Sequence, residues 1–127
     1  NWGVNHRVVS VRIPESDENN LRFEHRVAGA DANPYLVMAA VVAAAHHGIK
    51  NRIDPGRMVQ QGEAIVPKLK IPNRWDAALD RFSRSKVLRE YLGEDYCRYY
   101  TMVRRAESAR FHDAVAPRDF DWYLRVV

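Results

Sequence analysis

The chain has 127 residues, which is enough for one domain or for part of a larger one. Hydrophobic residues make up 46% and charged residues 28%, as in ordinary soluble globular proteins. The net charge is only +4, and the cations are spread along the chain among acids, so no nucleic-acid partner is expected. The longest apolar run, residues 35–45, is too short to cross a bilayer, which excludes a membrane span of that kind.

A single cysteine, Cys97, excludes an internal disulfide framework and is consistent with a reducing compartment, so we expect a cytoplasmic protein. No segment of Lys or Arg followed by an apolar run opens the chain as a signal peptide would. The sequence begins without methionine and enters strand-like sequence almost at once. We therefore expect a piece of a longer protein.

Two strands are predicted near the start of the chain. Residues 8–13 are rich in β-branched side chains and end at Pro14. In that segment Val9 and Val11 share one face and Val8 lies on the other, because side chains alternate along a strand. The polar residues 15–20 connect it to a second strand, residues 21–27, which suggests a hairpin. Two strands alone are marginal in water, so we expect this pair to belong to a sheet whose other strands are absent from the chain.

The second strand has one apolar and one charged face. The apolar face carries Leu21, Phe23, His25 and Val27, and the charged face carries Arg22, Glu24 and Arg26. On the apolar face His25 is expected to be a hydrogen-bonded core residue. A row of cation, carboxylate and cation suits an anionic substrate beside a metal ion, but a solvated strand face with offsetting charges is the commoner explanation of such a row. The residues alone leave both interpretations open.

A helix is predicted after Asn33-Pro34, because Asn caps free amides and Pro suits the first helical position. Residues 35–46 are apolar on nearly every face, which is typical of a buried helix. Gly48 is expected to end it in a left-handed conformation. Residues 50–72 show only turn signals, and so long a connection is usually functional or bound to a partner.

The remainder of the sequence is predicted to be helical. Asn73 is expected to cap a helix over residues 75–82, and Ser85 to cap another over residues 86–92, which Gly93 ends. The longest helical pattern covers residues 94–112, and Pro117 opens a last helix to residue 124. We expect the long helix to pack through its aromatic stripe: Tyr96, Tyr99, Tyr100, Val103, Ala106 and Phe111.

Apart from the charged strand face, the residues alone give no complete catalytic motif. Glu24 would need two more ligands to hold a metal, and no spacing in the sequence supplies them. The adjacent His46 and His47 point about 100° apart on a helix, so they cannot share a metal. Cys97 is expected to be a packing residue, and no phosphate loop or nucleophile elbow is present. What remains is an arginine-rich site suited to phosphates and carboxylates.

Several motifs follow one another in order within the first 36 residues. They are Trp2-Gly3, Asn5-His6-Arg7, Val11-Arg12-Ile13-Pro14, Arg22-Phe23-Glu24-His25-Arg26 and Ala32-Asn33-Pro34-Tyr35-Leu36. Together they resemble the C-terminal part of the glutamine synthetase catalytic domain. Residues 29–35 look more like the γ-glutamylpolyamine synthetase branch than the nitrogen-assimilating enzymes. Residues 92–99 and 119–124 are also similar to that superfamily.

The resemblance implies an α+β fold in which the whole chain, residues 1–127, is the C-terminal segment of one catalytic domain. Its parts would be active-site strands in residues 1–30, a buried helix in 31–49, a loop in 50–72 and a helical subdomain in 73–127.

The family joins an amine to the γ-carboxylate of glutamate through a γ-glutamyl phosphate made from ATP. By resemblance, Arg7 would be catalytic and would touch the phosphates of ATP and the glutamyl group. Arg12 and Arg22 would also bind ATP, and Arg26 would hold glutamate. Glu24 would be a ligand of Mg²⁺ or Mn²⁺. These roles agree with the chemistry, because phosphoryl transfer depends on positioning and on charge stabilisation by arginine and metal.

The resemblance also implies a ring-shaped homo-oligomer, with glutamate, ATP and an amine or ammonia as substrates and no membrane or nucleic-acid partner. Active sites of the family form between subunits, and the other metal ligands and the N-terminal β-grasp domain are absent from these residues. The chain alone is therefore expected to be inactive.

The sequence departs from the family pattern at three places. His6 replaces the Asn that usually precedes the first arginine, which puts the contacts of that side chain in doubt. Residues 15–20 contain no Lys or Arg, although some members use a basic residue there for ATP. Residues 57–70 contain no tyrosine, so control by nucleotidylation is not expected.

Three alternatives remain open from the sequence. The acceptor could be ammonia, which would make the protein a glutamine synthetase proper. The protein could instead be a structural or interaction member that keeps the fold without catalysis. In a third interpretation, the helical tail binds a partner through exposed aromatic residues such as Trp122 and Tyr123.

Overall fold

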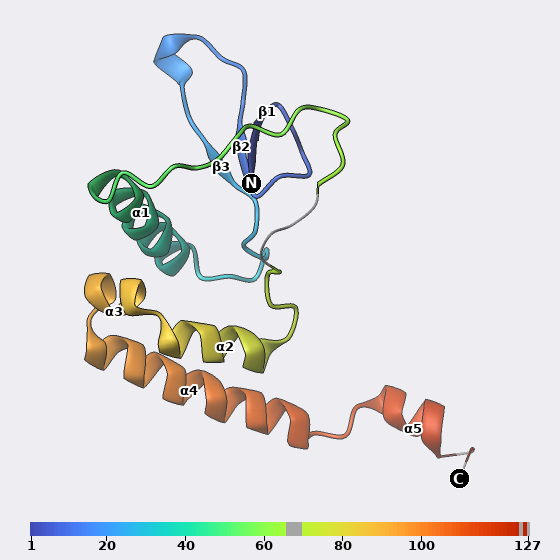
Figure 1. The fold of residues 1–127 in the computed structure, drawn as a ribbon. Coiled ribbons are helices and arrows are strands. Elements are labelled where there is room, and N and C mark those ends of the chain that lie inside the picture. Colours follow the sequence, from blue (N-terminus) through green and yellow to red (C-terminus); the bar gives the residue numbers. More distant parts are fainter. Residues whose placement is uncertain (66–69, 125, 127) are drawn as a thin grey trace. The chain divides into compact units, whose positions relative to one another are not determined.

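The structure is a computed structural model that describes residues 1–65, 70–124 and 126. The chain divides into two compact units, Asn1–Lys70 and Ile71–Val127. Among the described residues, the first unit contains a small sheet and helix α1, and the second contains helices α2 to α5 (Figure 1). The predicted α+β class is confirmed.

The sheet has three short strands in the order β1-β2-β3. They are β1 (Trp2–Val4), β2 (Val11–Ile13) and β3 (Glu24–His25), with a short 3₁₀ helix, η1 (Glu18–Asn20), between β2 and β3. The antiparallel pairing of β2 with β3 confirms the predicted hairpin, although both strands are shorter than predicted. Strand β1, which pairs in parallel with β2, was not predicted.

The connection from β1 to β2 explains why the predicted strand over residues 8–13 begins only at Val11. Asn5 has a φ of 50°, in the left-handed region that Asn tolerates better than most residues. The N–H of Val8 donates to Nδ1 of His6 at 3.2 Å, which holds residues 6–8 in a turn. The predicted faces are correct: Val9 is 2% exposed, whereas Val8 is 76% exposed.

Part of the long loop after α1 lies against the edge of β1. The N–H of Val59 donates to the carbonyl of Trp2 at 2.9 Å, and Nε1 of Trp2 donates to the carbonyl of Gly56 at 2.8 Å. Any side chain at Gly3 would place its Cβ 2.8 Å from the carbonyl oxygen of Val59, so this close approach requires glycine.

The same loop carries a local ion pair. Arg57 and Glu63 are joined through both carboxylate oxygens, and the pairing lowers the pKa of Glu63 to about 2. Apart from Lys50, which ends helix α1, the described parts of the predicted loop contain no helix or strand, and residues 66–69 of that segment lie outside the described residues.

Helix α1 (Pro34–Lys50) begins as predicted but ends later. The side chain of Asn33 accepts hydrogen bonds from the N–H of Tyr35 at 3.0 Å and of Leu36 at 3.3 Å. The prediction that Gly48 ends the helix is wrong: Gly48 lies inside it, and the cap residue is Asn51. The backbone N–H and the side-chain amide of Asn51 both donate to the carbonyl of His47, which satisfies the last turn.

The prediction that this helix is buried is also wrong within the described structure. Only Ala43 is buried, while Met38 and Val42 are more than half exposed. Strand β2 and the β3 region face one side of the helix, and a hollow of about 370 Å³ lies between them and α1. An apolar sequence shows that a helix can be buried, but the covering surface must come from other residues.

The second unit is a helical assembly in which α4 packs along α2 and α3. Its helices are α2 (Trp75–Arg84), α3 (Lys86–Leu92), α4 (Glu94–Asp113) and α5 (Pro117–Tyr123), shown in Figure 1. The buried residues of α4 are Cys97, Thr101 and Ser108, at helical spacing, rather than the predicted aromatic stripe. Tyr100 of the stripe packs against Phe82 of α2, with ring centroids 5.0 Å apart, whereas Tyr99 and Phe111 remain more than half exposed.

Local capping signals were mostly correct in this unit. The hydroxyl of Ser85 accepts the N–H of Leu88 at 3.2 Å, and Gly93 ends α3 with a φ of 87°. The predicted cap at Asn73 is wrong, because Arg74 takes the N-cap position and α2 has no side-chain cap. No helix of the described residues is long and apolar enough to cross a membrane.

The two asparagines provide a direct test of the capping assignment. Replacing Asn33 by Ala should lower the free energy of unfolding by about 1 kcal/mol, because two amides of α1 lose their acceptor. Replacing Asn73 by Ala should change it by less than about 0.5 kcal/mol. Urea unfolding followed by circular dichroism measures both values. Equal losses in the two variants would contradict the assignment.

Candidate functional site

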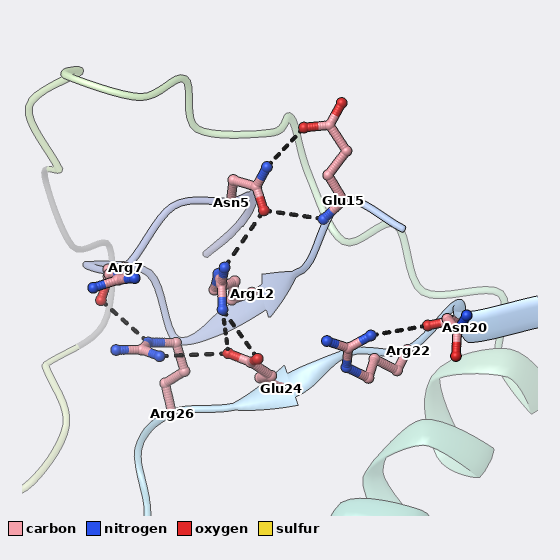
Figure 2. A network of polar contacts seen from close by, with 8 residues as sticks. All are labelled: Asn5, Arg7, Arg12, Glu15, Asn20, Arg22, Glu24 and Arg26. Carbon is pink, nitrogen blue, oxygen red and sulfur yellow. Dashed lines mark hydrogen bonds and ion pairs between the residues drawn. The ribbon is translucent and has the colours of Figure 1, made fainter. Parts of the chain in front are cut away.

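The sheet places Arg12 of β2 directly opposite Glu24 of β3. Nη1 of Arg12 donates to both carboxylate oxygens of Glu24, each at 3.0 Å (Figure 2). The two side chains are 21% and 33% exposed, so the pair is partly shielded from water. Cross-strand neighbours of opposite charge are a normal source of sheet stability, and this pair forms the centre of the candidate site.

Arg26 extends the charged row beyond the end of β3. Its Nη1 lies 3.5 Å from Oε2 of Glu24, and its Nε donates to the backbone carbonyl of Arg7 at 3.1 Å (Figure 2). Its own backbone N–H donates to the carbonyl of Ser10 at 2.9 Å. These contacts bring Arg7 beside the row through its main chain, while the side chain of Arg7 is exposed.

Arg22 lies before β3 and is held by a local contact. Its Nη1 donates to the carbonyl of Asn20 at 3.1 Å, so the side chain turns toward η1 (Figure 2). Its charge still acts on Glu24 at longer range. The structure therefore gathers Arg12, Glu24 and Arg26 into one contact network and places Arg7 and Arg22 around it.

The electrostatics of this network favour anions. The hydrogen bond from Arg12 is the main cause that lowers the pKa of Glu24, and the charges of Arg12, Arg26 and Arg22 act in the same direction against desolvation. Glu24 is therefore ionised at neutral pH. Glu24 and Glu15, the latter held by Asn5, lie beside four arginines, so positive charge remains in excess, which suits phosphates and carboxylates.

Asn5 is part of this network, although the sequence analysis gave it no role. Its Oδ1 accepts the N–H of Glu15 at 3.0 Å and lies 3.4 Å from Nη2 of Arg12, and its Nδ2 donates to Oε2 of Glu15 at 2.9 Å. The tolerance of Asn for a positive φ was the one available signal, since it favours a turn before the strand. Nothing in the sequence indicated that its side chain reaches Arg12.

The two histidines of the motif region occupy different environments. His6 is 5% exposed, and its Nε2 has no hydrogen-bond partner among the described residues. His25 is exposed and borders the apolar hollow beside α1, so the prediction of a core histidine is wrong. Strand β3 ends at His25, and too few strands surround it to bury the ring.

The described residues do not form a metal site by themselves. No group of three or more His, Cys, Asp or Glu side chains able to hold an ion occurs in residues 1–65, 70–124 and 126. Both oxygens of Glu24 already accept hydrogen bonds from Arg12. Glu24 can therefore supply one ligand at most, and the other ligands would have to come from elsewhere.

Comparison with protein families shows which family this chain belongs to. Residues 1–123 match the family model described as glutamine synthetase, catalytic domain. The chain belongs to the glutamine synthetase catalytic-domain family. The resemblance inferred from the motifs is confirmed, and the α+β unit is consistent with a part of that domain.

This chain is similar to several named proteins over a part of their length. It is 40% identical over 124 residues to the γ-glutamylputrescine synthetase PuuA of Escherichia coli K12, covering 98% of this chain and 26% of that protein. It is 30% identical to type-1 glutamine synthetase 2 of Dictyostelium discoideum, covering 99% and 25%. It is 30% identical to a γ-glutamylethanolamide synthetase of Streptomyces coelicolor, covering 98% and 26%. The chain thus spans about a quarter of the length of these relatives. The 40% identity to a γ-glutamylputrescine synthetase supports the resemblance to the polyamine branch.

Cys97, the one cysteine of the chain, is buried on α4 as predicted. It is 2% exposed, and burial raises the pKa of its thiol above the ordinary value. We expect iodoacetamide to modify Cys97 more than about tenfold more slowly in the native protein than in denaturant, because the reactive thiolate is scarce and covered. Peptide mass spectrometry after timed alkylation measures both rates. Equal rates would contradict a packing role.

Proposed function

We propose that this chain is the C-terminal segment of the catalytic domain of an ATP-dependent ligase that joins glutamate to a polyamine. The reaction would pass through a γ-glutamyl phosphate made from ATP. The observation that carries the proposal is the contact network of Arg12, Glu24 and Arg26, in a chain that matches the glutamine synthetase catalytic domain over residues 1–123.

The arginines have separate roles in this proposal. Arg12 and Arg22 bind ATP, and Arg26 holds the carboxylate of glutamate. Arg7 touches both the nucleotide phosphates and the glutamyl phosphate, where it stabilises the charge of the transferred group. Arginine suits each role because its planar guanidinium always carries charge and donates to two oxygens at once. Phosphoryl transfer depends mainly on this kind of positioning and charge stabilisation.

Glu24 supplies one ligand of a divalent ion, Mg²⁺ or Mn²⁺, and residues outside the described part of the chain supply the others. When bound, such an ion neutralises charge on the transferred phosphoryl group. The lowered pKa of Glu24 supports this role, because a carboxylate must be ionised to bind a metal.

The proposed acceptor is a polyamine because the identity to the γ-glutamylputrescine synthetase is 40%, against 30% to the Dictyostelium glutamine synthetase. The latter similarity favours ammonia as the second candidate. We further propose a ring-shaped homo-oligomer, in which residues 1–30 line the active site, residues 31–49 support the sheet through α1, and residues 50–72 and 73–127 form the loop and helical parts.

The role of Glu24 can be tested in the full-length protein with Glu24→Gln. The variant keeps an oxygen that can accept from Arg12 but removes the charge that a metal requires. Formation of ADP with glutamate and amine should fall about a hundredfold or more, because several kcal/mol of transition-state stabilisation is lost. Glu18→Gln, an exposed position in η1, is the matched control and should keep wild-type turnover.

Near-normal turnover of Glu24→Gln would rule out the metal role. A wild-type protein that forms no ADP with any acceptor would favour the non-catalytic alternative.

The acceptor can be identified with the wild-type protein alone. We expect kcat/KM for putrescine to exceed that for ammonia by more than about tenfold, which corresponds to about 1.4 kcal/mol of differential transition-state binding. Ethanolamine, a shorter acceptor with a single amine, serves as a comparison. A coupled ADP assay at saturating ATP and glutamate measures all three. Preference for ammonia would identify a glutamine synthetase proper.

A further inference from the structure

Arg12 is attached to Glu24 in a way that leaves its orientation open. Both contacts to the carboxylate come from the same nitrogen, Nη1, so they do not fix the plane of the guanidinium. A bidentate pair of hydrogen bonds from two different nitrogens would fix that plane. The second fixed point is Nη2, which lies 3.4 Å from Oδ1 of Asn5 (Figure 2). Asn5 therefore determines how the guanidinium of Arg12 is turned.

Asn5 is itself held from three directions. Its backbone N–H donates to the carbonyl of Ile13 at 2.9 Å, its Oδ1 accepts the N–H of Glu15, and its Nδ2 donates to Oε2 of Glu15. These contacts tie the turn before β2 to the residues just after it. The side-chain oxygen of Asn5 is consequently in a defined place before Arg12 reaches it.

Arg12 retains donor capacity beyond these contacts. Its Nε is buried and has no hydrogen-bond partner among the described residues, and Nη2 carries a second hydrogen besides the one directed at Asn5. A guanidinium held in one orientation loses less entropy when it binds an oxyanion than one that can rotate.

We propose that Asn5 is a positioning residue that orients Arg12 for the phosphates of ATP, and that Glu15 supports it. This inference rests on the proposed function. Asn5 acts through Arg12 and does not touch substrate. Replacing Asn5 should therefore change the binding of ATP and leave the binding of glutamate unchanged, because the glutamate carboxylate is assigned to Arg26 and Arg7.

The test uses the full-length protein with Asn5→Gly. Glycine adopts the positive φ of this position without strain, so the change removes the side chain and keeps the turn. We expect the KM for ATP and the dissociation constant of ATP measured by calorimetry to rise about fivefold to tenfold, while the KM for glutamate stays within twofold. Asn51→Ala, which removes a side-chain cap of α1, is the matched control and should leave nucleotide binding unchanged.

Two further variants separate positioning from a general structural effect. Asn5→Asp places two carboxylates together and should weaken ATP binding. Adding Glu15→Gln should restore it, because the donor and acceptor then exchange places across the 2.9 Å contact at unchanged total charge. In an Arg12→Ala background, Asn5→Gly should have no additional effect on the dissociation constant of ATP.

The inference would be overturned if Asn5→Gly bound ATP as tightly as the wild type, or if the KM for ATP and the KM for glutamate rose equally. It would also be overturned if the effects of Asn5→Gly and Arg12→Ala on the dissociation constant of ATP were fully additive. The inference would likewise be overturned if adding Glu15→Gln to Asn5→Asp did not restore the binding of ATP. If the wild-type protein itself binds no ATP, the proposed function fails, and the inference fails with it.

Discussion

The pairing of Arg12 with Glu24 depends on the register of β2 against β3, and the apolar side of the sheet fixes that register. A shift of one residue would turn Glu24 to the opposite face, because side chains alternate along a strand. Phe23 and His25 border the hollow beside α1, together with Val11 of the neighbouring strand. The apolar side chains that border this hollow therefore favour the observed register, and the charged row lies on the other face of the sheet.

The ion pairs of this row contribute little to stability, and this is consistent with a binding role. Partly exposed pairs are worth about 0–1 kcal/mol, since each loses hydration and side-chain freedom when it forms. The backbone ladder of β2 and β3 positions Arg12 and Glu24 in any case.

Local signals in the sequence predicted the elements that depend on neighbouring residues. Alternation in residues 21–27 separated the charged from the apolar face, and the caps at Asn33, Ser85 and Gly93 are correct because each acts within one turn of helix. Strand β1 escaped prediction because three residues centred on Gly3 have no periodicity, and the pairing with β2 is not a hairpin. Burial was predicted least well. The exposure of α1 and the small buried residues of α4 depend on which other surfaces are present.

The candidate site shows the same division between local and non-local information. The charged face was visible in the sequence, but the roles of its members came from the family resemblance, since spacing alone also fits a solvated strand. Asn5 could not be found in either way, because its contact with Arg12 depends on how the turn at residues 5–10 folds back onto β2.

The balance of charge indicates what the row of arginines lacks. Glu24 is the one carboxylate in contact with Arg12 and Arg26 among the described residues, and it accepts from both. A single negative charge cannot compensate two guanidinium groups that lie so close together, and Arg7 and Arg22 add to the excess. A polyphosphate beside Arg12 and Arg26 would supply the missing negative charge. Such a ligand would lower the mutual repulsion of the arginines, so its binding energy would include relief of a strain already present in the free chain.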